Sequence, residues 1–150
     1  MTKIVLIGVI LLLVWIRIMM PFIRERLLDR KEFETCPIQS KFNVLLSELD
    51  KIVFGGEAVM TVYEEQPEYI YIEGPAGHKV KYCMMYSTGS LTVQIILDVE
   101  GEQKIVNRQY YGLRDTEAYI QKNLARTIFG DTQASCIQCN IDILSDSRQS

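Results

Sequence analysis

The chain has 150 residues and a formal net charge of −3, and hydrophobic residues make up 48% of it. This length suits one domain with a substantial core but not two. The first 31 residues carry six basic and two acidic side chains, whereas the rest carries 10 basic and 17 acidic ones. A remainder with a net charge of −7 lacks the basic surface that binds phosphate, so we expect no nucleic-acid partner.

After a short flank at residues 1–3, residues 4–23 are almost entirely apolar, and Arg17 is their only charged residue. As a helix, 20 residues extend about 30 Å, which matches the hydrocarbon core of a bilayer. We therefore expect a transmembrane helix with Trp15 and Arg17 near one interface. One alternative is a cleaved signal peptide, although residues 17–24 offer no small residue for cleavage. The other is a helix buried in a larger assembly.

Residues 24–39 are predicted to form a basic juxtamembrane segment and linker. Pro21 is expected to interrupt the helix without necessarily ending it. The segment is then either an interfacial helix that meets anionic headgroups or a solvated linker. Its basic side chains are Arg24, Arg26, Arg30 and Lys31.

Basic residues also predict the orientation. The segment that follows the apolar stretch carries more positive charge than the amino-terminal flank, whose only basic side chain is Lys3. Because positive flanks stay inside, we expect the soluble domain in the cytoplasm. The alternative orientation would place it in the periplasm or outside the cell.

The soluble domain is expected over residues 40–144 and opens with a helix. Ser40 is a candidate N-cap, and Gly55-Gly56 is a candidate C-cap. Between them, apolar residues recur at helical spacing, which predicts one buried helix face. These residues are Phe42, Leu45, Leu46, Leu49 and Val53.

A run of strand patterns follows, separated by turn residues such as Gln66-Pro67, Ser87-Thr88-Gly89 and Glu100-Gly101. Short loops favour antiparallel neighbours, so we expect a five-stranded meander. The five predicted strands cover residues 57–64, 69–73, 78–86, 91–99 and 102–111.

A second helix is predicted from Asp115 or Thr116, with Ile120, Leu124 and Ile128 facing inward and Gly130 ending it. Alternation over residues 137–143 then predicts a sixth strand. A polar tail at residues 145–150 completes the chain. The expected class is α+β: a transmembrane helix, then an antiparallel sheet of five to six strands packed with two helices, in the order α-β-β-β-β-β-α-β.

The four cysteines give weak signals. Cys136 and Cys139 match the C-x-x-C spacing, but on a strand residues three apart point to opposite faces. Cys139 is then expected to be a small buried hydrophobe. Cys36 and Cys83 stand alone, which suits a four-cysteine zinc site poorly, so we expect no metal. We expect free thiols in the cytoplasm, and disulfides are possible only if the domain is exported.

No catalytic residue is assigned. His78 is the only histidine, and neither a nucleophile nor an orienting carboxylate stands beside it in the sequence. Nucleotide-binding glycine motifs and the H-E-x-x-H motif do not occur in the sequence. We therefore expect neither a cofactor nor an enzymatic activity, and an enzyme would require titratable groups that converge around His78 or Cys83.

Eight tyrosines are the one oddity of composition. If Ile70 and Ile72 face the core, Tyr69 and Tyr71 face outward and are candidates for binding a protein partner. The alternative is simple β-propensity. The favoured function is a non-enzymatic interaction or scaffold domain, bound to the bilayer and to a protein in a membrane complex. The second hypothesis is a carrier or sensor with an apolar ligand between sheet and helices, lined by Met60, Met84 and Met85.

Overall fold

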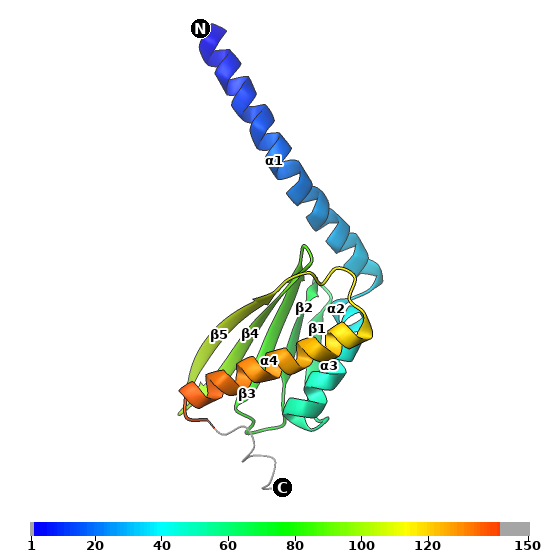
Figure 1. The fold of residues 1–150 in the computed structure, drawn as a ribbon, viewed down its shortest axis with the longest axis vertical. Coiled ribbons are helices and arrows are strands. Elements are labelled where there is room, and N and C mark those ends of the chain that lie inside the picture. Colours follow the sequence, from blue (N-terminus) through cyan, green and yellow to red (C-terminus); the bar gives the residue numbers. More distant parts are fainter. Residues whose placement is uncertain (1, 142–150) are drawn as a thin grey trace.

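The computed structural model describes residues 2–141, and it begins with one long helix, α1 (Thr2–Thr35). This helix projects away from the rest of the chain, which folds into a head of one sheet and several helices (Figure 1). Pro21 lies inside α1 and does not end it. Proline lacks the N–H that would bond one turn back, so one bond of the helical ladder is missing while the helix continues.

Three short helical segments lead from α1 into the sheet: α2 (Ile38–Lys41), α3 (Asn43–Leu49) and the π-helical turn η1 (Asp50–Phe54). The predicted N-cap at Ser40 is wrong, because Ser40 lies within α2. The predicted apolar face is confirmed, since Phe42, Leu45, Leu46, Leu49 and Val53 are all buried. Gly55 ends the segment with a φ of 66°, a conformation that glycine adopts at little cost.

The sheet is the predicted five-stranded antiparallel meander, in the order β1-β2-β3-β4-β5. The turn before β2 lies at residues 64–65, so Gln66-Pro67 opens β2 rather than breaking the chain between strands. Two hairpins have positive φ at both central residues, as type I′ turns require. They are Thr88-Gly89 and Glu100-Gly101. The strands are β1 (Val59–Tyr63), β2 (Gln66–Glu73), β3 (Val80–Ser87), β4 (Ser90–Val99) and β5 (Glu102–Tyr110).

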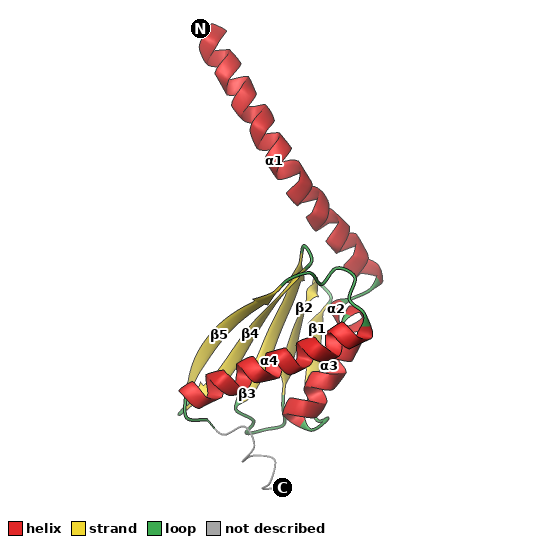
Figure 2. Ribbon diagram, viewed as in Figure 1, coloured by secondary structure: helices red, strands yellow, loops and turns green. Residues whose placement is uncertain are grey.

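Helices cover one face of the sheet, and the other face is uncovered (Figure 2). On the covered face, alternate residues of β2, β3 and β4 are fully buried against α3, η1 and the last helix, α4 (Ala118–Gln138). Tyr82 reaches through this core, where its hydroxyl lies 2.7 Å from Oγ1 of Thr132 on α4. Burial raises the pKa of Tyr82 above its ordinary value.

The last helix is longer than predicted, and it occupies the beginning of the segment predicted as a sixth strand, so that prediction is wrong there. α4 continues through Gly130, so Ile137 and Gln138 are helical, and residues 142 and 143 lie outside the described residues. The side chains buried beyond Gly130 are Thr132, Ser135 and Cys136, which continue the helical spacing of the residues before it. Burial of that face outweighs the roughly 1 kcal/mol that a helical glycine costs. The predicted caps Asp115 and Thr116 also lie outside the helix, whose N-cap is Glu117.

Candidate functional site: the long helix, its junction with the head, and the open sheet face

The apolar part of α1 lies against no other part of the described chain. Side chains over residues 4–23 are exposed except for half-buried Met19, and Trp15 and Arg17 are both exposed. The helix is long and apolar enough to cross a membrane by length and composition. The basic residues proposed for the juxtamembrane segment (Arg24, Arg26, Arg30 and Lys31) are exposed on the same continuous helix.

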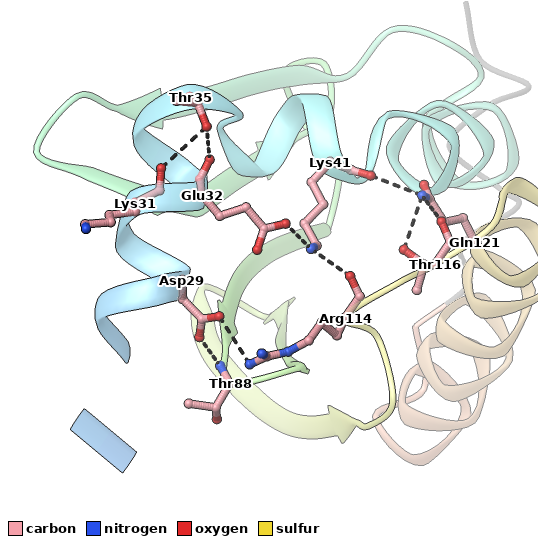
Figure 3. A network of polar contacts seen from close by, with 9 residues as sticks. All are labelled: Asp29, Lys31, Glu32, Thr35, Lys41, Thr88, Arg114, Thr116 and Gln121. Carbon is pink, nitrogen blue, oxygen red and sulfur yellow. Dashed lines mark hydrogen bonds and ion pairs between the residues drawn. The ribbon is translucent and has the colours of Figure 1, made fainter. Parts of the chain in front are cut away.

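The end of α1 is fixed to the head by Asp29, which is only 6% exposed (Figure 3). Its carboxylate accepts a hydrogen bond from the backbone N–H of Thr88, in the β3–β4 turn. It also lies 3.6 Å from a guanidinium nitrogen of Arg114, in the loop before α4. A buried carboxylate needs such partners, because burying an unpaired charge is costly. Asp29 therefore joins three segments that are far apart in the sequence.

One helical turn later, Glu32 makes a second connection (Figure 3). The ammonium of Lys41 donates to Glu32 at 2.7 Å and to the carbonyl oxygen of Arg114 at 3.0 Å. The same ammonium lies 4.7 Å from the centre of the Tyr86 ring, a favourable cation–π distance. Burial lowers the pKa of Lys41, but the bond to Glu32 and nearby negative charge outweigh this, so that the pKa is raised.

Packing strengthens the junction. Phe33 is buried on the side of α1 that faces the head. Its ring centre lies 5.2 Å from that of Tyr86 in an edge-to-face arrangement. Gln121 of α4 connects the next layer: its side chain accepts from the backbone N–H of Leu45 at 3.1 Å and donates to the carbonyl oxygen of Lys41 at 3.1 Å. The last turns of α1 are therefore part of the head rather than a loose linker.

Sequence reasoning missed these junction residues. Asp29 stands among basic residues that suggest a lipid-facing role, and its partners Thr88 and Arg114 lie 59 and 85 positions away. Asp29 is one of four acidic residues in the basic end of this helix, with Glu25, Glu32 and Glu34, and nothing in the sequence distinguishes it from the other three. It becomes informative only once the fold brings the β3–β4 turn beneath α1.

The uncovered side of the sheet, called here the open face, carries Tyr69 and Tyr71. Both are half-buried and lie opposite the core side chains Ile70 and Ile72. Strand pairing places Tyr69 beside Met85 and Tyr71 beside Cys83. Two cross-strand rows at the centre of the open face contain no charged residue. These rows are Thr61–Tyr71–Cys83–Gln94–Asn107 and Tyr69–Met85–Thr92–Gln109.

Charged residues on the open face lie beside those rows. Lys81 and Glu73 are paired across β3 and β2, with their charged atoms 3.6 Å apart. In the same row, Ile96 pairs with the exposed Ile105 of β5. Depletion of charge together with partly exposed Tyr, Met and Ile side chains is typical of the centre of a protein interface.

The cysteines are placed differently from expectation. Cys136 lies in the last turn of α4 and is buried, and Cys139 is its half-buried C-cap, so the strand argument that separated the two thiols was wrong. The position is still unlike a redox motif, which uses a helix N-terminus to stabilise a thiolate. Burial, with a smaller effect of Cys139, instead raises the pKa of Cys136 to about 11. Cys36 and Cys83 are half-buried free thiols.

His78 packs against Phe54, with ring centres 4.8 Å apart, and its Nδ1 lies 3.3 Å from the backbone N–H and carbonyl oxygen of Val80. Within residues 2–141, no group of three His, Cys, Asp or Glu side chains could hold a metal ion. Cys83 lies on the open face within β3, whereas His78 precedes that strand and packs against Phe54, and burial raises the pKa of the Cys83 thiol. A nucleophile with a converging base is not formed by these residues.

The three methionines suggested as the lining of a ligand cavity do not share one side of the sheet. Met60 and Met84 face the helices, whereas Met85 pairs with Tyr69 on the open face. Two hollows of the described chain lie at surface turns, around Tyr63–Gln66 and Pro75–His78, and neither lies between sheet and helices.

Comparisons with protein-family models, with curated proteins and with solved structures found no match to this chain. No relative therefore indicates an enzymatic activity.

Proposed function

We propose that this chain is a membrane-anchored, non-enzymatic interaction domain whose open face binds protein in a membrane complex. The observation that carries the proposal is the apolar stretch of α1. It is long enough to span a bilayer, and no part of its most apolar 18 residues is buried by the rest of the chain. In water such a helix would expose apolar side chains on every side, which soluble proteins avoid.

Anchoring and partner binding support one another in this proposal. The junction at Asp29, Glu32 and Phe33 fixes the head to the end of the proposed anchor. A head confined to the membrane meets a membrane partner at a high effective concentration. The basic residues after the apolar stretch favour a cytoplasmic head, in contact with anionic headgroups.

The first test is extraction of native membranes with alkaline carbonate, which removes peripheral proteins. The full-length chain is expected to stay with the membranes. A variant with Val9→Arg and Leu12→Arg is expected to be released, because each arginine near the centre of a span costs about 3 kcal/mol. Release of the wild-type chain would contradict the anchor.

The second test is purification of the tagged chain from native membranes in mild detergent. We expect it to elute in a complex, and Tyr71→Lys to weaken that complex by about 3 kcal/mol because it buries an unpaired charge. Tyr119→Lys is the matched control, since Tyr119 is an exposed tyrosine on α4, outside the open face. Elution of the wild-type chain as a lone monomer would overturn the interaction role.

A further inference from the structure

We propose that the open face binds the open face of a second copy of this chain in the same membrane, an inference that rests on the proposed function and names its partner. The two copies would be related by a two-fold axis directed along the proposed anchor. The juxtaposition that carries the inference is an uncharged sheet surface that faces sideways from α1, with Cys83 at its centre.

The orientation of the open face allows such a pair. In Figure 1, α1 and the sheet extend in the plane of the view with α4 in front, so the open face points backward, to the side of α1. Rotation by 180° about an axis along α1 turns one open face toward the other. Both long helices still point to the same side, as two anchors in one bilayer must. The contact is isologous, as in most two-fold dimers.

Charge on the open face suits an identical partner. The two central rows contain no ionisable carboxylate, lysine or arginine, and the neighbouring Glu73 and Lys81 neutralise each other. Two such faces can meet without bringing like charges together, which would cost several kcal/mol. A strongly acidic or strongly basic partner would find no complementary charge there.

The size of the open face is adequate for a confined dimer. Five strands at about 4.8 Å spacing and three rows of side chains about 6.7 Å apart cover roughly 500 Å² on each copy. The total of about 1,000 Å² lies at the lower limit for a specific interface. Confinement of both copies to one membrane raises their effective concentration, so a modest interface suffices.

The two-fold axis also predicts a specific neighbour. In Figure 1, α1 crosses the direction of the strands, so the strands of the two copies would also cross, and an axis through the centre of the open face brings the centre of the middle strand β3 over its own copy. Cys83 is on β3 in the middle row of the open face, so the two Cys83 thiols are expected to face each other. Packed sheets lie about 10 Å apart, which brings side chains of the two faces into contact.

The experiment uses the full-length chain in native membranes, with Cys36→Ser and Cys139→Ser, so that Cys83 and the buried Cys136 remain. A short bismaleimide forms one carbon–sulfur bond with each of two thiols as each proton moves to a maleimide carbon. We expect a covalent species of twice the chain mass, lost on adding Cys83→Ser. A chain that carries Cys83→Ser with Gln133→Cys on the exposed side of α4 is the matched control and should stay monomeric.

A second measurement separates this inference from the proposed function. The rate at which a monofunctional maleimide modifies Cys83 is compared between membranes and the chain diluted in detergent. A slow rate in membranes together with the cross-linked pair supports the second copy. A slow rate without self-cross-linking means that another protein covers the face, which overturns this inference and leaves the proposed function standing. Equal rates without cross-linking overturn both.

Discussion

Asp29 is a buried carboxylate on a helix whose neighbouring side chains are nearly all exposed. Its bond from the Thr88 N–H and its proximity to Arg114 connect α1 to the head through two segments that the sequence separates widely. The conformation of the turn adds to the connection, because Thr88 has a φ of 50°, which non-glycine residues adopt only where contacts support it.

Asp29→Ala is expected to loosen this turn by about 1–3 kcal/mol, because the Thr88 N–H and the Arg114 side chain lose their shared partner. Hydrogen exchange of residues 86–90 in the detergent-solubilised chain measures the effect. Glu25→Ala, an exposed acidic residue one turn earlier on α1, is the control and should leave exchange unchanged. Equal exchange in wild type and Asp29→Ala would mean that the carboxylate does not hold the turn.

Cys136 gives a prediction for alkaline pH. Its pKa of about 11 in the folded chain exceeds the ordinary value of 9.0, because burial disfavours the thiolate. Below pH 9 the Cys136 thiol is neutral in both the folded and the unfolded chain, so its full contribution to stability is present. As the pH rises from 9 to 11, the thiol ionises in the unfolded chain but not readily in the folded chain, which lowers the unfolding free energy.

Cys136→Ala should therefore reduce the loss of unfolding free energy between pH 9 and 11 by about 1–2 kcal/mol. Urea unfolding at several pH values measures this slope. Ser135→Ala changes the adjacent buried residue of α4 without removing a titratable group, and it should keep the wild-type slope. A Cys136→Ala slope that also equals wild type would contradict the assigned cause.

At the scale of elements, the strands were predictable because alternation of apolar and polar residues is a local property. Val80, Tyr82, Met84 and Tyr86 are buried as the period of two requires, and the five-stranded meander follows. The end of α4 was not predictable in the same way. Ile137, Cys139 and Ile141 alternate like a strand, yet Ile137 is 75% exposed on the helix while Thr132 and Cys136 face the core.

Gly130 is the residue that misled the prediction, and it provides a test of the helix. It lies in the middle of α4, is exposed, and an added Cβ would meet nothing within 4 Å. Gly130→Ala should raise the unfolding free energy by about 0.5–1 kcal/mol, because alanine restricts the unfolded chain and favours the helix.

Urea unfolding of the head measures this gain. Gly89→Ala is the opposing control, since Gly89 has a φ of 77° in the β3–β4 turn and alanine there should destabilise the fold. A Gly130→Ala variant less stable than wild type would indicate that α4 ends near residue 130, as the sequence pattern first predicted.

At the scale of the whole molecule, α1 and the head form one continuous object, because α1 reaches Thr35 as a helix and its last turns pack into the head. Figure 1 shows the consequence: the apolar stretch and the sheet extend from a common junction. A movement of the proposed anchor would therefore be transmitted to the β3–β4 turn through Asp29 rather than absorbed by a linker.

Orientation is the prediction that belongs to this scale. In a chain without its native cysteines, Gln133→Cys on α4 should resist a membrane-impermeant maleimide on intact cells and react after permeabilisation, because the proposed orientation, based on the positive-inside rule, places the head in the cytoplasm. Thr2→Cys, on the other side of the apolar stretch, should react on intact cells. Labelling of Gln133→Cys without permeabilisation would reverse the orientation.

The sequence alone determined what depends on near neighbours: the apolar stretch of spanning length, the strand alternation, the Thr88-Gly89 and Glu100-Gly101 turns, and that Tyr69 and Tyr71 point to the face opposite Ile70 and Ile72. These features follow from periodicity and from turn residues, which act within a few positions along the chain. The tertiary structure alone decided that Asp29, Thr88 and Arg114 meet, that α4 continues past Gly130, and which sheet face stays open. Those outcomes depend on the burial that residues far apart in the sequence give each other, and no local pattern encodes it.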